Sequence, residues 1–179
     1  MRNNAKWASL AFSTQRLTVS DVGSFLRTEA SKTALLSSIV ELFSPSVVQS
    51  LPPYFHDIGS VEAADGWLTK MVSESHLFTV CLNDSESVMG FVFIYDSGEE
   101  SAHLGYLLAE RCWHQGYGYE LLQGIVECCR SQQLVGSLVG GVDSGNIASA
   151  KLLLKAGFVA DVEDDNGITF YHCNLSSLV

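Results

Sequence analysis

Residues 103–122, which read HLGYLLAERCWHQGYGYELL, constrain the fold of this chain more than any other stretch. An apolar run from His103 to Ala109 ends in a polar loop that carries Gly116 and Gly118, and a helical apolar pattern follows at 121–126. The order predicts a strand, a glycine turn and a helix whose first N–H groups point away from the helix. Those groups favour an anion such as phosphate, and glycine permits its close approach. Because a GxG pair alone is a weak signal, the phosphate hypothesis depends on further motifs.

The composition predicts one folded domain over residues 1–179. Hydrophobic residues make up 47% of the chain and charged residues 17%, which excludes global disorder. No apolar run reaches the length of a membrane span, and the N-terminus lacks the layout of a secretion signal. The five cysteines include no CxxC pair and no histidine partners at zinc spacing. We therefore expect a reducing, cytoplasmic location, with no metal and no membrane partner.

The charge of the chain limits its partners. Its formal net charge is −10, from 20 acidic and 10 basic residues. Nucleic acid is disfavoured, because binding it requires a basic surface. A cationic partner suits this charge, although solubility alone explains it equally well. A phosphate-rich ligand would need local backbone donors rather than bulk positive charge.

The first part of the chain predicts a short strand followed by helices. Residues 1–15 show no pattern, so we expect a loose lead-in there. The expected elements are a strand at 16–19, one or two helices within 24–43 with a possible break at 31–33, and a helix at 61–72 capped by Ser60. Ser44-Pro45 is expected to stop the helical segment. The proline-rich aromatic loop at 51–55 could line a ligand pocket or cover the core, and the sequence favours neither.

The second part of the chain predicts a sheet. The expected elements are strands at 77–82, 88–95 and 101–108, a helix at 117–132, a strand at 137–142, a helix at 147–156 that ends at Gly157, and a hairpin of 159–162 with 168–174. The strands that flank the 117–132 helix are expected to be parallel, because a helix between two strands is the usual crossover. The fold class is therefore a mixed α/β (α+β) layered domain.

Two groups of motifs give the chain a family resemblance. Leu104-Gly105-Tyr106 and the stretch Trp113 to Glu120 are followed by Asn146-x-x-Ser149 and by Lys155-Ala156-Gly157-Phe158. Together they resemble the GNAT superfamily of N-acetyltransferases, in its RimJ/RimL-like branch, which acetylates the N-termini of ribosomal proteins. The resemblance extends from Arg16 to the final hairpin. It implies a mostly antiparallel central sheet, with a parallel pair splayed at the acetyl-CoA site and helices on both faces.

The resemblance also implies a cofactor site. The matching loop of the family binds the coenzyme A pyrophosphate; here it comprises Trp113, His114, Gln115, Gly116, Tyr117, Gly118 and Tyr119. Main-chain groups of Leu107 and Leu108 would hold the pantetheine arm and the acetyl end. Asn146 and Ser149 would also contact acetyl-CoA, although Asn146 alone predicts a helix cap. The basic residues Arg111, Lys151 and Lys155 are expected near this site, or simply on solvated surfaces.

Three departures from the family pattern matter. Trp113 stands where many relatives have Arg or Gln, as is common in the RimJ/RimL branch. His114 stands where that branch often has glycine, so the loop backbone is less free there. Leu153 occupies the position at which other branches place a tyrosine that protonates the leaving thiolate. That acid is therefore absent from its usual helix.

The implied reaction is direct attack of a neutral amine on the acetyl thioester. The expected catalytic groups are the main-chain N–H of Leu107 or Leu108 as oxyanion donor and Ser149 as thiolate acid, although Ser149 could equally be a small packing residue. The candidate bases are His103, Glu100 and Asp143, and no pattern separates them. Glu99 and Glu100 are expected at the acidic rim of an acceptor cleft.

Three functions remain open from the sequence. The first is acetylation of a cationic amine at a protein or peptide N-terminus. The second is acetylation of a small amine such as a polyamine, amino acid or drug. The third is a non-catalytic acyl-CoA-binding module. The chain is expected to be a monomer or a homodimer.

Overall fold

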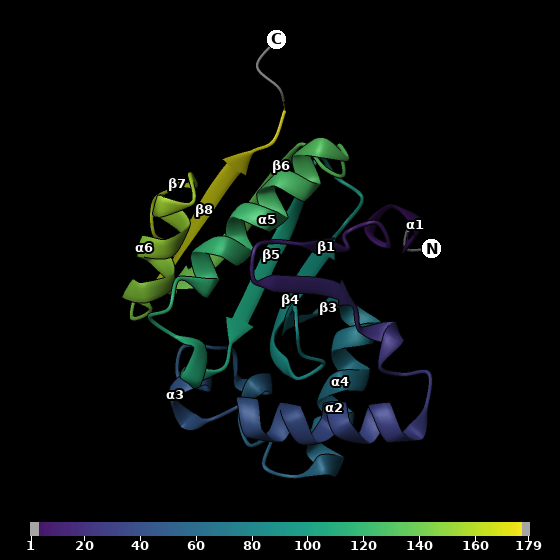
Figure 1. The fold of residues 1–179 in the computed structure, drawn as a ribbon. Helices are drawn as coiled ribbons and strands as arrows, with labels where there is room; N and C mark the ends of the chain where they lie inside the picture. The colour runs from purple at the N-terminus through teal and green to yellow at the C-terminus, as the bar shows by residue number, and fades with distance from the viewer. Residues whose placement is uncertain (1–3, 177–179) are drawn as a thin grey trace.

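The computed structural model describes residues 4–176, which form one eight-stranded sheet with helices on both faces (Figure 1). The strand order is β1-β2-β3-β4-β5-β6-β8-β7. The strands are β1 (Phe12–Ser13), β2 (Leu17–Asp21), β3 (His76–Leu82), β4 (Val88–Asp96), β5 (Ser101–Leu108), β6 (Ser137–Asp143), β7 (Val159–Ala160) and β8 (Ile168–Asn174). The helices are α1 (Asn4–Trp7), α2 (Glu29–Leu42), α3 (Pro45–Val48), α4 (Val61–Glu74), α5 (Tyr117–Ser131) and α6 (Ile147–Lys155). Three 3₁₀ turns complete the fold, namely η1 (Val22–Ser24), η2 (Pro53–Phe55) and η3 (Glu110–Cys112).

The sheet separates two hydrophobic cores. Helices α5 and α6 cover one face, where Leu121, Ile125 and Leu153 pack on the strands. Helices α2 and α4 cover the other, where Ile39 and Trp67 pack on the strands. Side chains alternate between the faces along each strand. Both faces of the central strands are therefore buried, which explains their nearly continuous apolar sequences.

The parallel pair is short, and this positions the candidate site. Strands β5 and β6 are paired only from Ser101 with Ser137 to His103 with Val139. Beyond His103, β5 stays paired with β4 as far as Leu108. Strand β6 stays paired with β8 over its whole length. The two parallel strands therefore diverge toward their C-terminal ends, as expected from the family resemblance.

The N-terminal segment is packed rather than loose. Trp7 and Leu10 are fully buried, and the Trp7 Nε1–H donates a 2.6 Å hydrogen bond to the Asp96 carboxylate. The expectation of a loose lead-in is therefore wrong for residues 4–15, while residues 1–3 lie outside the described part. Two isolated large side chains hold the segment, and two such anchors leave no periodic pattern to detect.

The segment at 24–43 forms a single α-helix. Helix α2 begins at Glu29 after the N-cap Thr28, whose hydroxyl accepts a hydrogen bond from the Ser31 N–H. The expected break at 31–33 is absent, because these polar residues belong to the first turns of the helix, where Ser31 and Lys32 are half-buried and Thr33 is exposed. Ser44-Pro45 ends this segment and also caps the next helix, α3, with Pro45 at its first position.

The remaining expectations agree with the structure within a few residues. Helix α4 begins after Ser60, whose hydroxyl accepts a hydrogen bond from the Ala63 N–H. The segments 77–82, 88–95 and 101–108 fall in the consecutive strands β3, β4 and β5, and the chain then runs through η3 to α5. Gly157 has φ +95°, a left-handed conformation that ends α6.

Candidate active site

The loop between β5 and α5 presents backbone donors at the N-terminus of a helix. Gly116 adopts φ +82° and serves as the N-cap of α5, without a capping side chain. The first intrahelical bond joins the Glu120 N–H to the Gly116 carbonyl. The N–H groups of Tyr117, Gly118 and Tyr119 therefore precede the helical ladder and point out of its end. This arrangement suits an anion such as phosphate, as predicted.

The side chains of Arg16 and Glu120 form a brace that holds this loop in place. The Glu120 carboxylate accepts hydrogen bonds from the Arg16 side chain at 2.6 Å and from the Arg16 main-chain N–H at 2.8 Å. The Thr14 hydroxyl donates to the same carboxylate at 2.5 Å. A second Arg16 nitrogen donates to the Gln115 carbonyl at 3.0 Å, and the guanidinium lies 4.3 Å from the centre of the Tyr117 ring. One arginine thus fixes both sides of the glycine turn.

The electrostatics of the brace keep Glu120 ionised. Burial alone would raise the pKa of this carboxyl, but the hydrogen bonds from Thr14 and Arg16 outweigh burial and hold the pKa below its usual value. A carboxylate in the first turn also suits the positive end of the helix dipole. The sequence predicted Glu120 only as the last residue of the family motif, not as the partner of Arg16. An acidic residue in the first helical turn was the available signal.

The two glycines of the turn have different structural roles. Gly116 needs its left-handed φ, whereas Gly118 lies within the first turn of α5. A Cβ on Gly118 would lie 2.7 Å from Leu152 Cδ2, so the missing side chain lets α6 pack against α5. Gly118 therefore has a packing role in addition to any role in phosphate binding.

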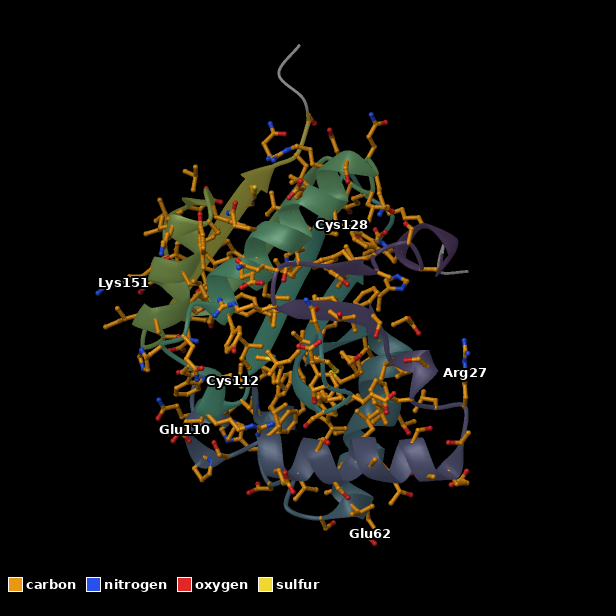
Figure 2. The ribbon with its side chains drawn as sticks, in the orientation of Figure 1. Arg27, Glu62, Glu110, Cys112, Cys128 and Lys151 are labelled. Atoms are coloured by element: carbon orange, nitrogen blue, oxygen red, sulfur yellow. The ribbon has the colours of Figure 1, made fainter. Side chains whose placement is uncertain are left out.

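Two other loop residues show how the loop is held. The Trp113 indole N–H donates to the Leu108 carbonyl at 2.9 Å, which ties the loop to the end of β5. His114 has φ +59°, a conformation that is costly for a residue with a Cβ. This explains why glycine would be easier to accommodate at position 114. In η3, Glu110 accepts a 3.2 Å hydrogen bond from Ser44, and Figure 2 shows Glu110 and Cys112 beside this end of the sheet.

A cavity of about 180 Å³ lies where β5 and β6 diverge. Its walls include Leu104 to Leu107 of β5 and Gly140 to Asp143 of β6. It also reaches residues that pack on opposite faces of the sheet. Those on the α6 side are Asn146, Ser149 and Leu153, and those on the α2 and α4 side are Leu51, Pro52, Tyr54, Phe55, Phe93 and Tyr95. The aromatic loop at 51–55 therefore lines a pocket, and Phe55 also covers the core.

The register of β5 determines which backbone groups face this cavity. The Ala109 N–H bonds to the Met89 carbonyl of β4, and the Glu100 carbonyl accepts from Gly136 and Ser137 beside β6. Because backbone groups alternate in direction along a strand, the N–H of Leu107 points to β4. The N–H groups of Tyr106 and Leu108 point to the side of β6. Of the two predicted oxyanion donors, Leu108 directs its N–H to the β6 side, whereas Leu107 lines the cavity but directs its N–H to β4.

The cavity holds a hydrogen-bonded pair of hydroxyl groups. The Tyr106 phenol lies 2.9 Å from the Ser149 hydroxyl. Burial raises the pKa of Tyr106 to about 12, although the hydrogen bond to Ser149 opposes this shift. The sequence predicted Ser149 as a site residue, whereas Tyr106 was predicted only as part of a family motif. The signal for it was a tyrosine in the mostly apolar run before the glycine loop, because a tyrosine hydroxyl that becomes buried needs a partner.

Of the three candidate bases, Asp143 lies on the cavity wall. His103 lies within the paired part of β5, where its ring faces Phe170 edge-on at 6.3 Å, and it is not among the described residues that line the cavity. Glu100 precedes β5, seven residues from Leu107, which corresponds to about 20 Å along an extended chain. Glu99 and Glu100 therefore lie near the end of β5 opposite the expected cofactor loop.

Asn146 caps α6, as its position predicted. Its side-chain oxygen accepts a 3.1 Å hydrogen bond from the Ser149 N–H, which orders the turn that carries Ser149. Lys155 lies 4.5 Å from the centre of the Tyr119 ring, whereas Lys151 points outward from α6 (Figure 2). Arg111 is exposed in η3. Across residues 4–176, no three His, Cys, Asp or Glu side chains gather as a metal site would require.

Comparison with known proteins identifies the family. A family model described as an acetyltransferase (GNAT) domain matches residues 29–159. The chain belongs to the GNAT acetyltransferase family. The match includes the expected cofactor loop, the diverging strands and Ser149. No curated protein matches the chain.

Solved structures of GNAT acetyltransferases share this fold. RimL, a ribosomal L7/L12 alpha-N-protein acetyltransferase in complex with coenzyme A, aligns with a TM-score of 0.72 and 14% identity over 90% of this chain and 95% of that chain. The ribosomal-protein-S5-alanine acetyltransferase from Vibrio fischeri has a TM-score of 0.69 and 14% identity over 92% and 96%. The microcin C7 self-immunity acetyltransferase MccE, with acetyl-CoA and AMP, has a TM-score of 0.69 and 13% identity over 90% and 93%.

The features of the site fit an acyl-CoA. Backbone donors stand at the N-terminus of α5, and the β5–β6 ladder ends at His103, before the part of β5 that lines the cavity. Gly140 and Gly141 place no side chain on the β6 wall. None of the helices within residues 4–176 is both long and apolar enough to span a membrane.

Proposed function

We propose that this GNAT acetyltransferase transfers the acetyl group of acetyl-CoA to a primary amine by direct attack. The observation that carries the proposal is the cavity between the diverging strands β5 and β6, which Ser149 lines. Strand β5 leads on through η3 to the backbone donors at the N-terminus of α5. The loop from Trp113 to Tyr119 would bind the pyrophosphate through main-chain N–H groups. The thioester would lie in the gap, where the Leu108 N–H can stabilise the developing oxyanion.

We infer that the acceptor is the α-amine of a protein or peptide. The cavity wall on the α2 and α4 side carries the apolar or aromatic residues Leu51, Pro52, Phe55 and Phe93, together with the Tyr54 and Tyr95 rings. Asp143 is the one carboxylate among the described lining residues. Inside the cavity a polyamine would meet only this one carboxylate for its several charges, whereas a peptide presents one amine on a mostly neutral body. The RimL neighbour, an alpha-N-protein acetyltransferase, supports the same choice.

We place the acidic rim of the acceptor site at a different edge from the one expected from the sequence. Asp143 lies at the C-terminal end of β6, and the next residue, Ser144, donates its N–H to the Gly167 carbonyl at 2.9 Å. This bond joins the cavity edge to the acidic turn Glu163-Asp164-Asp165. These carboxylates, rather than Glu99 and Glu100, would attract a protonated amine to the entrance. Glu163, Asp164 and Asp165 do not line the cavity, so they would favour the protonated amine at the entrance and not beside the thioester, where attack needs the neutral amine.

The proposal is tested by incubating the protein with acetyl-CoA and three acceptor classes: peptides with free N-termini, the same peptides with blocked N-termini, and polyamines. We expect release of coenzyme A and mass-spectrometric acetylation of the free α-amines only. KM for these peptides should rise with ionic strength while kcat stays nearly constant, because rim attraction is screened by salt. Preferential turnover of polyamines would assign the small-amine function instead. Acetyl-CoA binding without turnover of any amine would indicate a non-catalytic module.

A further inference from the structure

The Tyr106 and Ser149 hydroxyl groups form a hydrogen-bonded pair on the cavity wall. Tyr106 comes from β5 and Ser149 from the first turns of α6, so the pair spans the two sides of the gap between the strands. Both side chains line the cavity, and their oxygens are 2.9 Å apart.

We propose that Tyr106 and Ser149 form a proton relay to the sulfur of the leaving thiolate. This inference rests on the proposed acetyl transfer. Ser149 is the catalytic member that contacts the sulfur, and Tyr106 is the positioning residue behind it, which orients the serine and replaces its proton. Leu153, where the resemblance led us to look for a tyrosine, lines the same cavity with an apolar side chain. The relay supplies the missing acid from β5 instead of from α6.

The relay conserves atoms and charge. The amine nitrogen forms a bond to the acetyl carbon, and the carbon–sulfur bond breaks with its electron pair on sulfur. Sulfur takes the Ser149 hydroxyl proton, Ser149 takes the Tyr106 proton, and the tyrosine regains, through water, the proton that the acylated nitrogen releases. The net transfer is from nitrogen to sulfur, so both hydroxyls end neutral. No separate acid or base needs to change its charge permanently.

The surroundings of Tyr106 suit this role. Burial favours the neutral phenol, so the hydroxyl keeps its proton across the physiological pH range. The Ser149 N–H is bonded to the Asn146 side chain, which fixes the helix turn and leaves the serine hydroxyl free to point between Tyr106 and the cavity. Among the predicted bases, Asp143 reaches the cavity wall but accepts the Gly145 N–H at 2.8 Å. A relay that returns its own proton removes the need for a nearby ionised base.

The test is a double-mutant cycle with Tyr106→Phe, Ser149→Ala and the double variant. We expect each single variant to lower kcat by about 10²-fold or more, with the Kd for acetyl-CoA and the KM for the peptide changed less than about threefold. Because both residues act on one proton path, the double variant should be about as slow as the slower single variant. Ser149→Thr, which keeps a hydroxyl, should recover part of the rate. Tyr171→Phe, at another buried tyrosine, is the matched control and should retain full activity.

Three outcomes would overturn the relay. The first is a Tyr106→Phe variant with kcat close to that of the wild type, and the second is a double variant whose defect is the product of the single defects. The third is a raised Kd for acetyl-CoA that accompanies a lowered kcat and a lowered melting temperature, which would indicate a structural role. A second measurement needs no variant. The wild-type kcat should not fall between pH 7 and 10, because Tyr106 stays protonated there, and a falling limb would assign the proton to another group. If the wild type acetylates no amine at all, the proposed function fails. If the wild type turns over normally and the Tyr106→Phe variant has the same kcat, only the relay is rejected.

Discussion

Replacing Glu120 by glutamine tests whether the Arg16–Glu120 brace organises the cofactor loop. Glutamine keeps the size and one acceptor oxygen, so the bonds from Thr14 and the Arg16 main chain can persist. Its amide group would face the Arg16 side-chain donor, so the 2.6 Å charged bond is lost. A charged hydrogen bond contributes about 1.5–3 kcal/mol, and the exposure of 39% of the Arg16 side chain reduces this to about 1 kcal/mol.

The expected result is weaker binding of acetyl-CoA. If the lost energy lowers the fraction of molecules with an ordered loop, the apparent Kd rises by up to about fivefold. Isothermal titration calorimetry of Glu120→Gln, Arg16→Lys and the wild type measures this change. Arg16→Lys keeps the charge but loses the planar fork, so it should also weaken binding.

The sign of the Glu120→Gln effect separates two accounts. If Arg16 instead bound the pyrophosphate directly, removing Glu120 would free the guanidinium and remove a nearby negative charge, so affinity would increase. A tighter complex for Glu120→Gln would therefore refute the bracing role. The melting temperature of each variant controls for loss of the whole fold.

Two further predictions concern stability. His114→Gly should raise the free energy of unfolding by about 1 kcal/mol, because glycine adopts φ +59° without the Cβ penalty. The urea midpoint of unfolding should rise accordingly, and an unchanged or lower midpoint would argue against strain at this residue. Burial would raise the pKa of Asp96, but bonds from Lys6, Trp7 and Gly98 outweigh it and lower the pKa to about 2. Its stabilisation is therefore complete above the unfolded pKa and is lost as pH falls toward 2, so Asp96→Asn should flatten the stability profile between pH 5 and 2; an equal slope in both proteins would contradict this.

The spacing of apolar residues and the helix-capping residues predicted most of the helices and strands, because both depend on residues that are close in sequence. Helix α4 and the strands β3 to β5 have regular spacing of apolar residues, and caps such as Ser60 and Asn146 mark helix starts within a few residues. The family motifs then placed the loop at Trp113 to Tyr119 before α5. The packing of segment 4–15 could not be predicted in this way, because it depends on two isolated buried side chains, Trp7 and Leu10.

The catalytic geometry was less accessible from the sequence. The Arg16–Glu120 pair joins residues 104 positions apart, and the Tyr106–Ser149 pair joins residues 43 apart. Such contacts depend on strand register and helix placement, which periodicity does not report. Glu100 illustrates the limit: it is close to the site motif in sequence, yet it lies at the opposite end of β5 from the cofactor loop.

Hydrogen–deuterium exchange with and without acetyl-CoA tests the central claim most directly. The N–H groups of Tyr117 and Tyr119 lack intrahelical partners, and those of Tyr106 and Leu108 point to the gap between β5 and β6. Acetyl-CoA should slow exchange in peptides that cover 113–120 and 104–109, while peptides from β3, away from the gap, remain unchanged. Protection confined to other segments, or no protection at saturating acetyl-CoA, would contradict the account.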